Sequence, residues 1–237
     1  MELSNSSVGA AVVAQAKGPL ERLIGVFVSP APTMQDIAAR PSWVLPLIVV
    51  TLIGSVGAFF LKDAILQTQL EAMEKRNMTA EQIEQARPTM EKVMNITVPL
   101  VPLITTPLFY LIIAGLLMFV GNVILGGEAK FSQLFAITCW SGLISVLGSI
   151  INIPIMAQKM VMESATSLSS LLPSEENQTL LYHLFSQIDL FWIWWVAVIG
   201  FGVAAVYKFS TRKAMTTVFT MWVIYVVIAV ALKSIFS

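Results

Sequence analysis

The chain has 237 residues, of which 57% are hydrophobic and only 12% are charged, and its formal net charge is zero. A soluble globular domain carries about 25% charged residues, so the composition excludes an ordinary soluble protein and favours a membrane protein. The balanced charge gives no basic face for a nucleic-acid partner, and the single cysteine, Cys139, excludes an intramolecular disulfide.

The N-terminal region is predicted to contain a tail and a short surface helix. Residues 1–16 lack the basic segment of a signal peptide, so we interpret them as a flexible tail. The next apolar residues recur at helical spacing, with Glu21 and Arg22 on the opposite side; they are Leu20, Leu23, Ile24, Phe27 and Val28. This segment is too short and too charged to cross a bilayer, so we expect an interfacial helix.

Five stretches carry no charge: Trp43–Leu61, Ile96–Leu125, Phe131–Met156, Leu190–Tyr207 and Ala214–Leu232. A helix of about 20 apolar residues crosses a bilayer, so each stretch can span the membrane. The sequence therefore predicts an all-α, polytopic membrane protein with five transmembrane helices plus short interfacial and extramembrane helices. Residues 17–237 are expected to form a single membrane domain.

Local patterns distinguish the spans from one another. The charged segment of about residues 64–95 is predicted to form an extramembrane helical hairpin, with a capping box at Thr79 and Gln82. The second span is overlong, and three prolines in its first half predict a broken or strongly kinked helix; they are Pro99, Pro102 and Pro107. The third span carries small residues at four-residue spacing, which favours close helix packing; they are Ser141, Ser145 and Ser149.

Loop charges predict the orientation, because short cytoplasmic loops are enriched in Lys and Arg. The turn between spans four and five holds Lys208, Arg212 and Lys213, whereas the segment between spans three and four holds only Lys159. This contrast, with five spans, puts the N-terminus in the cytoplasm. The five basic residues of the first loop argue for the opposite orientation.

The interiors of the spans contain no ionisable residue, although coupled transporters usually keep one there. Three polar residues near span ends are candidates for intramembrane or interfacial contacts: Asn122, Asn152 and Asp189. For the two asparagines, interhelical hydrogen bonding or helix capping is favoured over a ligand site. Asp189 is expected to cap the fourth span, where a carboxylate suits the helix dipole, with contact to a substrate or partner as the alternative. His183 is expected on the surface of a polar loop.

No pattern in the chain predicts catalysis, a metal site or a cofactor. One histidine and one cysteine, far apart in sequence, are too few for a typical zinc site. No known nucleophile or phosphate-binding motif is present. The expected class is therefore a non-enzymatic protein without metal or cofactor.

Several short motifs, in their order and spacing, resemble the bacterial type of Yip1-domain membrane protein; they are Phe27–Met34, Pro41–Trp43 leading into Pro46–Leu47, Gly126–Phe131, Asp189–Trp194 and Lys208–Ala214. The resemblance covers about residues 20–235. It implies a five-helix membrane domain with a cytoplasmic N-terminus, in the inner (cell) membrane of a bacterium. Eukaryotic members of the family resemble adaptors in vesicle trafficking that contact small Rab-type GTPases. The resemblance implies no catalytic residue.

These observations favour an integral membrane scaffold or interaction protein of the Yip1 type, which organises membrane partners. The expected partners are membrane lipids and other membrane proteins or further copies of the chain. The alternative is a small-molecule channel or transporter with a site near the proline-broken second span, since broken helices often line binding sites.

Overall fold

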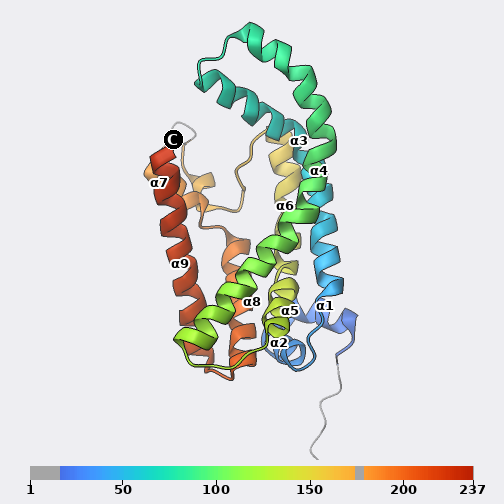
Figure 1. Ribbon diagram of the computed structural model, residues 1–237, viewed down its shortest axis with the longest axis vertical. Coiled ribbons are helices and arrows are strands. Elements are labelled where there is room, and N and C mark those ends of the chain that lie inside the picture. The colour runs from blue at the N-terminus through green and yellow to red at the C-terminus, as the bar shows by residue number, and fades with distance from the viewer. Residues whose placement is uncertain (1–16, 174–178, 237) are drawn as a thin grey trace, which may run out of the picture.

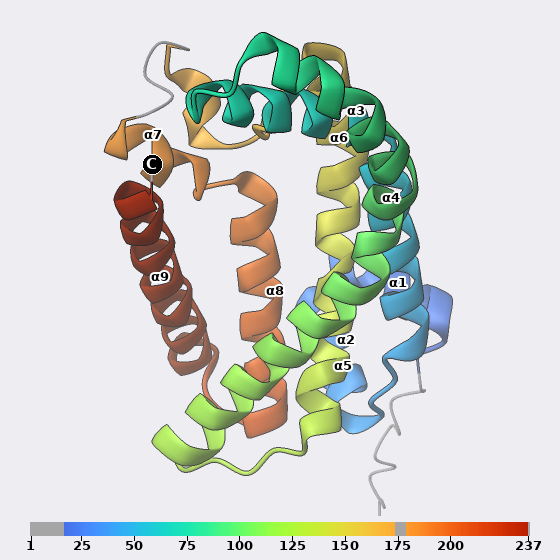
Figure 2. The ribbon, with the colours of Figure 1, turned by 45° about the horizontal axis from the view of Figure 1, so that its top comes forward.

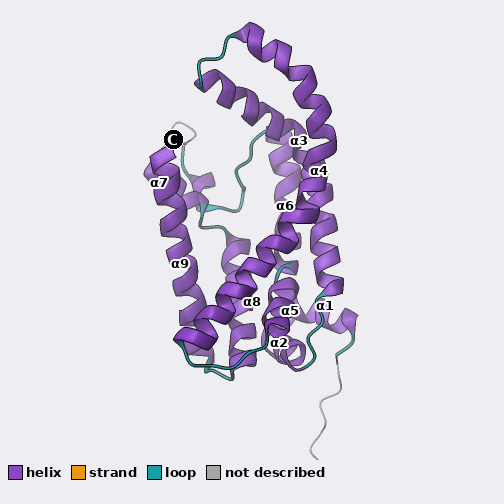
Figure 3. Cartoon of the chain, in the orientation of Figure 1, coloured by secondary structure: helices purple, strands orange, loops and turns teal. Residues whose placement is uncertain are grey.

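The computed structural model describes residues 17–173 and 179–236, so the predicted tail at residues 1–16 lies outside it. The described residues form helices and loops, with no strand beyond one bridge between Ser167 and Asp189 (Figure 3). Five helical segments are long and apolar enough to cross a membrane: α3 (Val44–Lys75), α4 with η1 (Ala80–Met118 and Phe119–Ile124), α5 with α6 (Phe131–Ser141 and Leu143–Lys159), α8 (Leu190–Tyr207) and α9 (Thr211–Phe236). The predicted all-α class with five transmembrane helices is confirmed.

The spans divide into a central pair and a periphery (Figure 1). In the apolar window of α5–α6, 67% of the residues are buried, and in that of α8 56% are buried. The corresponding shares are 22% for α3 and 17% for both α4 and α9. The peripheral helices therefore expose most of their apolar side chains, which suits lipid or a partner's helix.

Small residues let the central helices touch. A side chain at Gly202 of α8 would overlap Ile137 of α5, so the two helices pack with no space between that backbone and the isoleucine. Tyr207 fills the space above Gly121 and Gly127 in the same way. Dispersion contacts at such close approach are the main attraction available to helices inside a bilayer.

Two short helices, α1 (Pro19–Val28) and α2 (Pro30–Ala39), cover one end of the bundle. Leu20 and Ile24 of α1 are exposed, whereas Arg22 is only 7% exposed. Arg22 therefore lies opposite Leu20 and Ile24, as the helical spacing predicts, but it faces inward, while the two apolar side chains face outward, where lipid can cover them. Glu21 is expected beside Arg22 but is exposed, so that part of the prediction is wrong.

The inward-facing Arg22 is held by a dense set of partners. Its Nε donates to Asp36 Oδ2 at 2.7 Å, and its Nη1 donates to Ser42 Oγ at 2.7 Å and to the Arg40 carbonyl at 3.1 Å. The guanidinium of Arg40 pairs with the other carboxylate oxygen of Asp36. Burial lowers the pKa of Arg22 from its usual range, although a guanidinium stays charged in proteins. Trp140 Nε1 of α5 donates to the Ser42 carbonyl at 2.6 Å, which ties this cluster to the core.

At the opposite end, α3 and α4 extend beyond the other spans and meet in a helical hairpin (Figure 1). The predicted capping box is confirmed: Gln82 N donates to Thr79 Oγ1 at 3.3 Å, and Thr79 N donates to Gln82 Oε1 at 2.9 Å. The sequence predicts a broken or strongly kinked helix in the second span, and the break is absent, because α4 runs without interruption from Ala80 to Met118. It accommodates its prolines by curving along its length (Figure 2).

The connection between α6 and α8 folds over the same end as the hairpin. It contains η2 (Leu168–Leu171) and α7 (Leu180–Ser186). His183 lies in α7 and is only 5% exposed, so its predicted surface position is wrong. Burial and the nearby charge of Lys233 lower the pKa of His183.

Candidate functional site

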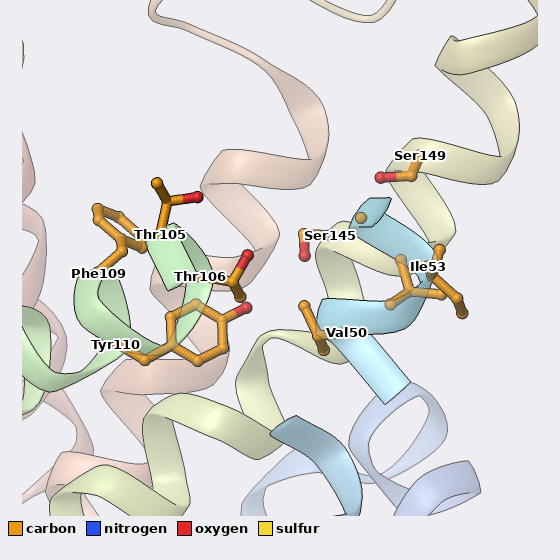
Figure 4. Close-up of a pocket in the computed structure, with 10 residues that line it drawn as sticks. Val50, Ile53, Thr105, Thr106, Phe109, Tyr110, Ser145 and Ser149 are labelled. Carbon is orange, nitrogen blue, oxygen red and sulfur yellow. The ribbon is translucent and has the colours of Figure 1, made fainter. Parts of the chain in front are cut away.

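A cavity of about 410 Å³ lies between α3, α4 and α6 (Figure 4). Its apolar wall includes Val50 and Phe109, and its polar lining consists of hydroxyl groups; these belong to Thr105, Thr106, Tyr110, Ser145 and Ser149. Figure 4 shows Thr106 and Tyr110 of α4 on one side of this space and Ser145 of α6 on the other. We call it the hydroxyl cavity.

The sequence places these hydroxyls at the level of the membrane. Thr105 and Thr106 stand between Pro102 and Pro107 of α4, and Thr105 Oγ1 donates to the Val101 carbonyl at 3.0 Å. Ser145 Oγ donates to a carbonyl of its own turn at 2.6 Å. Both side chains are therefore satisfied within their own helices, and both residues are exposed, so the cavity opens on the side of the bundle.

A second cavity, of about 460 Å³, continues the first toward the hairpin end. The two share Gly54, Ser145 and Ser149, so one hollow follows α3 and α6. Asn152 and Asp189 line the second cavity, which we call the Asp189 cavity. The structure thus places two of the three predicted site residues in one site.

Asp189 caps α8, as predicted. Its Oδ1 accepts hydrogen bonds from the backbone N–H groups of Phe191 at 2.8 Å and Trp192 at 3.3 Å. Its Oδ2 accepts from Ser164 Oγ at 2.7 Å and from Thr166 Oγ1 at 2.5 Å. These four donors are all neutral, and within the described ranges no Lys or Arg forms an ion pair with Asp189.

Thr166 links Asp189 to Asn152. The Nδ2 of Asn152 donates to Thr166 Oγ1 at 2.9 Å and to the Gly148 carbonyl at 3.1 Å. Asn152 is only 7% exposed, and its Oδ1 is buried without a hydrogen-bond partner among the described residues. A buried polar atom is nearly always hydrogen-bonded, so this vacant acceptor is unusual.

Asn122, the third predicted residue, lies at the other end of the bundle and lines neither cavity. Its Nδ2 donates to the Ala129 carbonyl at 3.2 Å, and its Oδ1 accepts from Ala129 N at 3.1 Å and from Tyr207 Oη at 2.8 Å. Asn122 therefore holds the turn after η1 against α8. This is the hydrogen-bonding role that was favoured from the sequence.

Sequence reasoning missed several residues of the site. Ser164 and Thr166 lie in a connection without periodicity, so no pattern marked them as partners of Asp189. Tyr110 gave no signal either, because one aromatic residue in an apolar span is ordinary. The spacing of Ser145 and Ser149 did mark a face of α6, and that face lines both cavities.

The described residues do not include a metal-binding group of three or more His, Cys, Asp or Glu side chains. The hollow instead offers hydroxyls, one vacant amide oxygen and one carboxylate, which can bind a hydrogen-bond donor. The Ser164 hydroxyl donates to Asp189 in this hollow, but none of the described residues that line either cavity is His, Cys or Lys.

Comparison with known proteins gives one match. The family described as the Yip1 domain matches residues 24–232. No curated protein and no solved structure matches the chain. Since the match covers nearly the whole described chain, including all five spans, the chain belongs to the Yip1-domain family of membrane proteins.

Proposed function

We propose that this protein is a non-enzymatic membrane scaffold of the Yip1 type, which organises other membrane proteins or further copies of itself within the bilayer. Family membership supports the broad class, a membrane protein of the Yip1 type. The observation that carries the scaffold role is the hydroxyl cavity, which opens sideways at membrane level. Small residues and hydroxyl side chains are what transmembrane helices use where they pack together.

The surroundings of the hydroxyl cavity suit a helix of a partner. Ile104 and Leu108 of α4 flank it and are exposed, as are Thr105 and Ser145 in its lining. A neighbouring helix can pack on the two apolar side chains and exchange hydrogen bonds with the two hydroxyls. Lipid chains can pack on the apolar side chains but cannot form the hydrogen bonds.

Site-specific photo-crosslinking in native membranes tests the scaffold role. A photoreactive residue at Thr105 or Ser145 should give a discrete protein adduct, whereas the same residue at Ile224, on the exposed face of α9, serves as the control. With the photoreactive residue at Thr105, the additional change Ser145→Leu should reduce recovery of that adduct about tenfold. Adducts to lipid alone at Thr105 and Ser145 would contradict the proposal.

We further propose that the N-terminus lies in the cytoplasm of a bacterial cell and that the protein resides in the inner membrane. The end of the bundle that holds α1 and α2 also holds both short turns, after η1 and after α8 (Figure 1). Its described basic residues lie in short segments next to the spans; they are Lys17, Arg22, Arg40, Lys130, Lys208, Arg212 and Lys213. The hairpin end holds as many, but five of them lie in the longer segment 62–95. Excess Lys and Arg in short loops favours the cytoplasmic side.

Topology reporters test this orientation. Alkaline phosphatase fused after α9 should be active, because that fusion point lies outside the cytoplasm, whereas a fusion in the turn after α8 should be inactive. The reverse pattern would contradict the orientation.

The alternative function is a small-molecule channel or transporter, and one observation favours it. The hydroxyl cavity combines an apolar wall with several hydroxyl groups at membrane level, which is the kind of lining that small-molecule sites have. Purified protein in liposomes would then pass a neutral polyol, and Thr106→Leu would abolish the flux. Absence of flux across a panel of polyols, amines and amino acids would remove this alternative.

A further inference from the structure

The Asp189 cavity has the size and lining of a small-ligand site. Its volume of about 460 Å³ falls within the range of about 300–1,000 Å³ that is usual for such sites. Most of its wall is apolar, and a minority of its lining side chains are polar; they are Ser145, Ser149, Asn152, Ser164, Ser186 and Asp189. An apolar wall with few polar groups is typical of a pocket that orients its ligand.

The side-chain oxygen of Asn152 lacks a hydrogen-bond donor among the described residues. Both hydrogens of its amide are used, by Gly148 and Thr166, while its Oδ1 is buried and has no donor within the described chain. Folding removes this oxygen from water without replacing the lost hydrogen bond. This oxygen has almost no accessible surface, so a ligand N–H or O–H group restores the hydrogen bond once the Asn152 side chain turns toward the cavity.

Asp189 determines the charge that the ligand should carry. The residue is 5% exposed, and its four hydrogen bonds come from neutral groups, so its negative charge is stabilised but not neutralised. Among the described residues that line the cavity, none is Lys, Arg or His. Buried charges are normally paired, so this cavity attracts a cation and disfavours an anion.

The aromatic residues in the wall favour an organic ammonium group over a metal ion. Phe191 and Trp192 follow Asp189 and line the same cavity. Aromatic rings attract ammonium groups through their negative faces, and an ammonium group also supplies the donor that Asn152 lacks. A metal ion would instead need several oxygen ligands, whereas Asp189 has already used both of its oxygens on hydrogen bonds.

We propose that the Asp189 cavity binds an organic ammonium group, with its N–H donating to Asn152 Oδ1, its charge facing Asp189 and its alkyl part against Phe191 and Trp192. The ammonium group can belong to a free amine or to the ethanolamine headgroup of a membrane lipid. The scaffold role rests on Thr105 and Ser145 at the open side of the hydroxyl cavity; Ser145 borders both cavities, whereas Thr105 lines only the hydroxyl cavity and so distinguishes the two sites.

Binding by the full-length protein in nanodiscs of phosphatidylglycerol, a lipid without an ammonium group, tests the proposal. In one arm, free ethanolamine is titrated, with glycerol as the uncharged probe, and the shift in melting temperature is recorded. In the other arm, phosphatidylethanolamine is added to the nanodiscs, and bound lipid is counted by native mass spectrometry. Saturable binding in the first arm identifies a free amine, and binding in the second arm alone identifies a lipid headgroup.

Two variants and two matched controls connect the binding to the cavity. Asp189→Asn keeps an oxygen for the helix cap but removes the charge, and Asn152→Leu removes the acceptor; each should weaken binding about tenfold or more. Asp63→Asn and Asn95→Leu make the same changes at exposed positions outside the cavity and should bind as the wild type does. The controls and both variants must elute as the same folded species, which can be checked by size-exclusion chromatography.

The proposal is overturned if neither arm shows saturable binding, or if glycerol binds as well as ethanolamine. It is also overturned if Asp189→Asn and Asn152→Leu both bind normally. Photo-crosslinking at Thr105 in the same variants separates this result from the scaffold role, because loss of amine binding with an unchanged protein adduct leaves the scaffold intact.

Discussion

Asp36 of α2, whose side chain is 9% exposed, and the buried Asp189 at the start of α8 belong to opposite ends of the bundle (Figure 1). Among the described residues, Asp36 has two cationic partners and Asp189 has none within ion-pair distance. Arg22 and Arg40 neutralise Asp36, and the backbone around them is tied to α5 through Ser42. Asp189 is surrounded by hydroxyls and backbone N–H groups and borders a cavity. The first arrangement is complete within the chain, whereas the second leaves a charge and a vacant acceptor for something else.

The difference shows two uses of a polar group in an apolar bundle. A fully paired cluster fixes one packing arrangement, here the position of α1 and α2. A cluster with neutral donors holds a helix end while keeping its charge available. Variants that remove one charge at a time should therefore have unequal effects at the two ends.

Asp36→Asn should cause the largest loss of stability. It leaves Arg22, which is 7% exposed, without a counter-charge, and breaking a buried pair costs about 3–5 kcal/mol. The free energy of unfolding in mixed micelles measures the effect. Arg40→Gln is the control, because the Arg40 side chain is 45% exposed and the loss of an exposed pair costs about 1 kcal/mol or less. Equal losses in the two variants would show that Arg22 does not depend on Asp36.

Asn122→Leu should be the next most damaging change. It leaves the backbone N–H and C=O of Ala129 without their partner and removes the shorter of the two hydrogen bonds of the Tyr207 hydroxyl, whose other acceptor is the Leu117 carbonyl; this costs about 1–3 kcal/mol. The same unfolding measurement applies. Tyr207→Phe removes only one of these hydrogen bonds and should cost about 1 kcal/mol. If Asn122→Leu left the free energy of unfolding unchanged, the turn after η1 would need no side-chain support.

Substitutions at Asp189 should lower the free energy of unfolding less than Asp36→Asn does. Asp189→Ala removes the cap of α8, which is worth about 1 kcal/mol and at most about 2. Asp189→Asn retains an acceptor for Phe191 N and should lose only a fraction of that. The free energies of unfolding of the two Asp189 variants and of Asp36→Asn, measured under the same conditions, give this comparison directly. A loss from Asp189→Asn as large as that from Asp36→Asn would mean that the two carboxylates play the same role.

Acidification should loosen α7, with the smallest effect of the four. His183 has its pKa lowered by burial and by Lys233 of α9 from the usual 6.5, so the folded state prefers the neutral ring. Its contribution to stability is present above about pH 6.5 and is lost as the pH falls from there through the folded-state pKa. The other acid–base groups on this contact are Tyr182, beside His183, and Glu163, which faces Tyr182.

Hydrogen exchange of the α7 amides measures this loosening at pH 7.5 and at pH 5.5. Exchange in the wild type should rise at the lower pH beyond the intrinsic change, and His183→Gln should remove that rise. A rise that persists in His183→Gln would assign the effect to Glu163 or to another carboxylate of this end.

Much of the architecture could be predicted from the sequence because its causes are local. The spans follow from uncharged stretches of sufficient length, and the caps at Thr79 and Asp189 follow from side chains that reach backbone N–H groups two or three residues away. The continuity of α4 could not be predicted, because neighbouring helices and threonine side chains can support a helix through its prolines.

The site was only partly predictable. Asn122 and Asn152 look alike in sequence, since each lies near the end of a span, yet one has all its partners and the other has a vacant acceptor. The Oδ1 of Asn122 accepts from Tyr207, 85 residues away in the chain, whereas Thr166, 14 residues from Asn152, bonds only the amide nitrogen of that residue. Hydrophobic periodicity in the sequence does not predict such hydrogen bonds.

The sequence by itself determined the membrane class, the five spans, the local helix caps and the absence of ionisable groups from the span interiors, because length, hydropathy and short-range hydrogen bonding decide those features. The tertiary structure alone decided that Arg22 turns inward to Asp36, that α4 stays whole and that Asn152 meets Asp189 beside a cavity. Each of these depends on which surfaces face lipid and which face another helix, and that choice is made only when all five spans pack together.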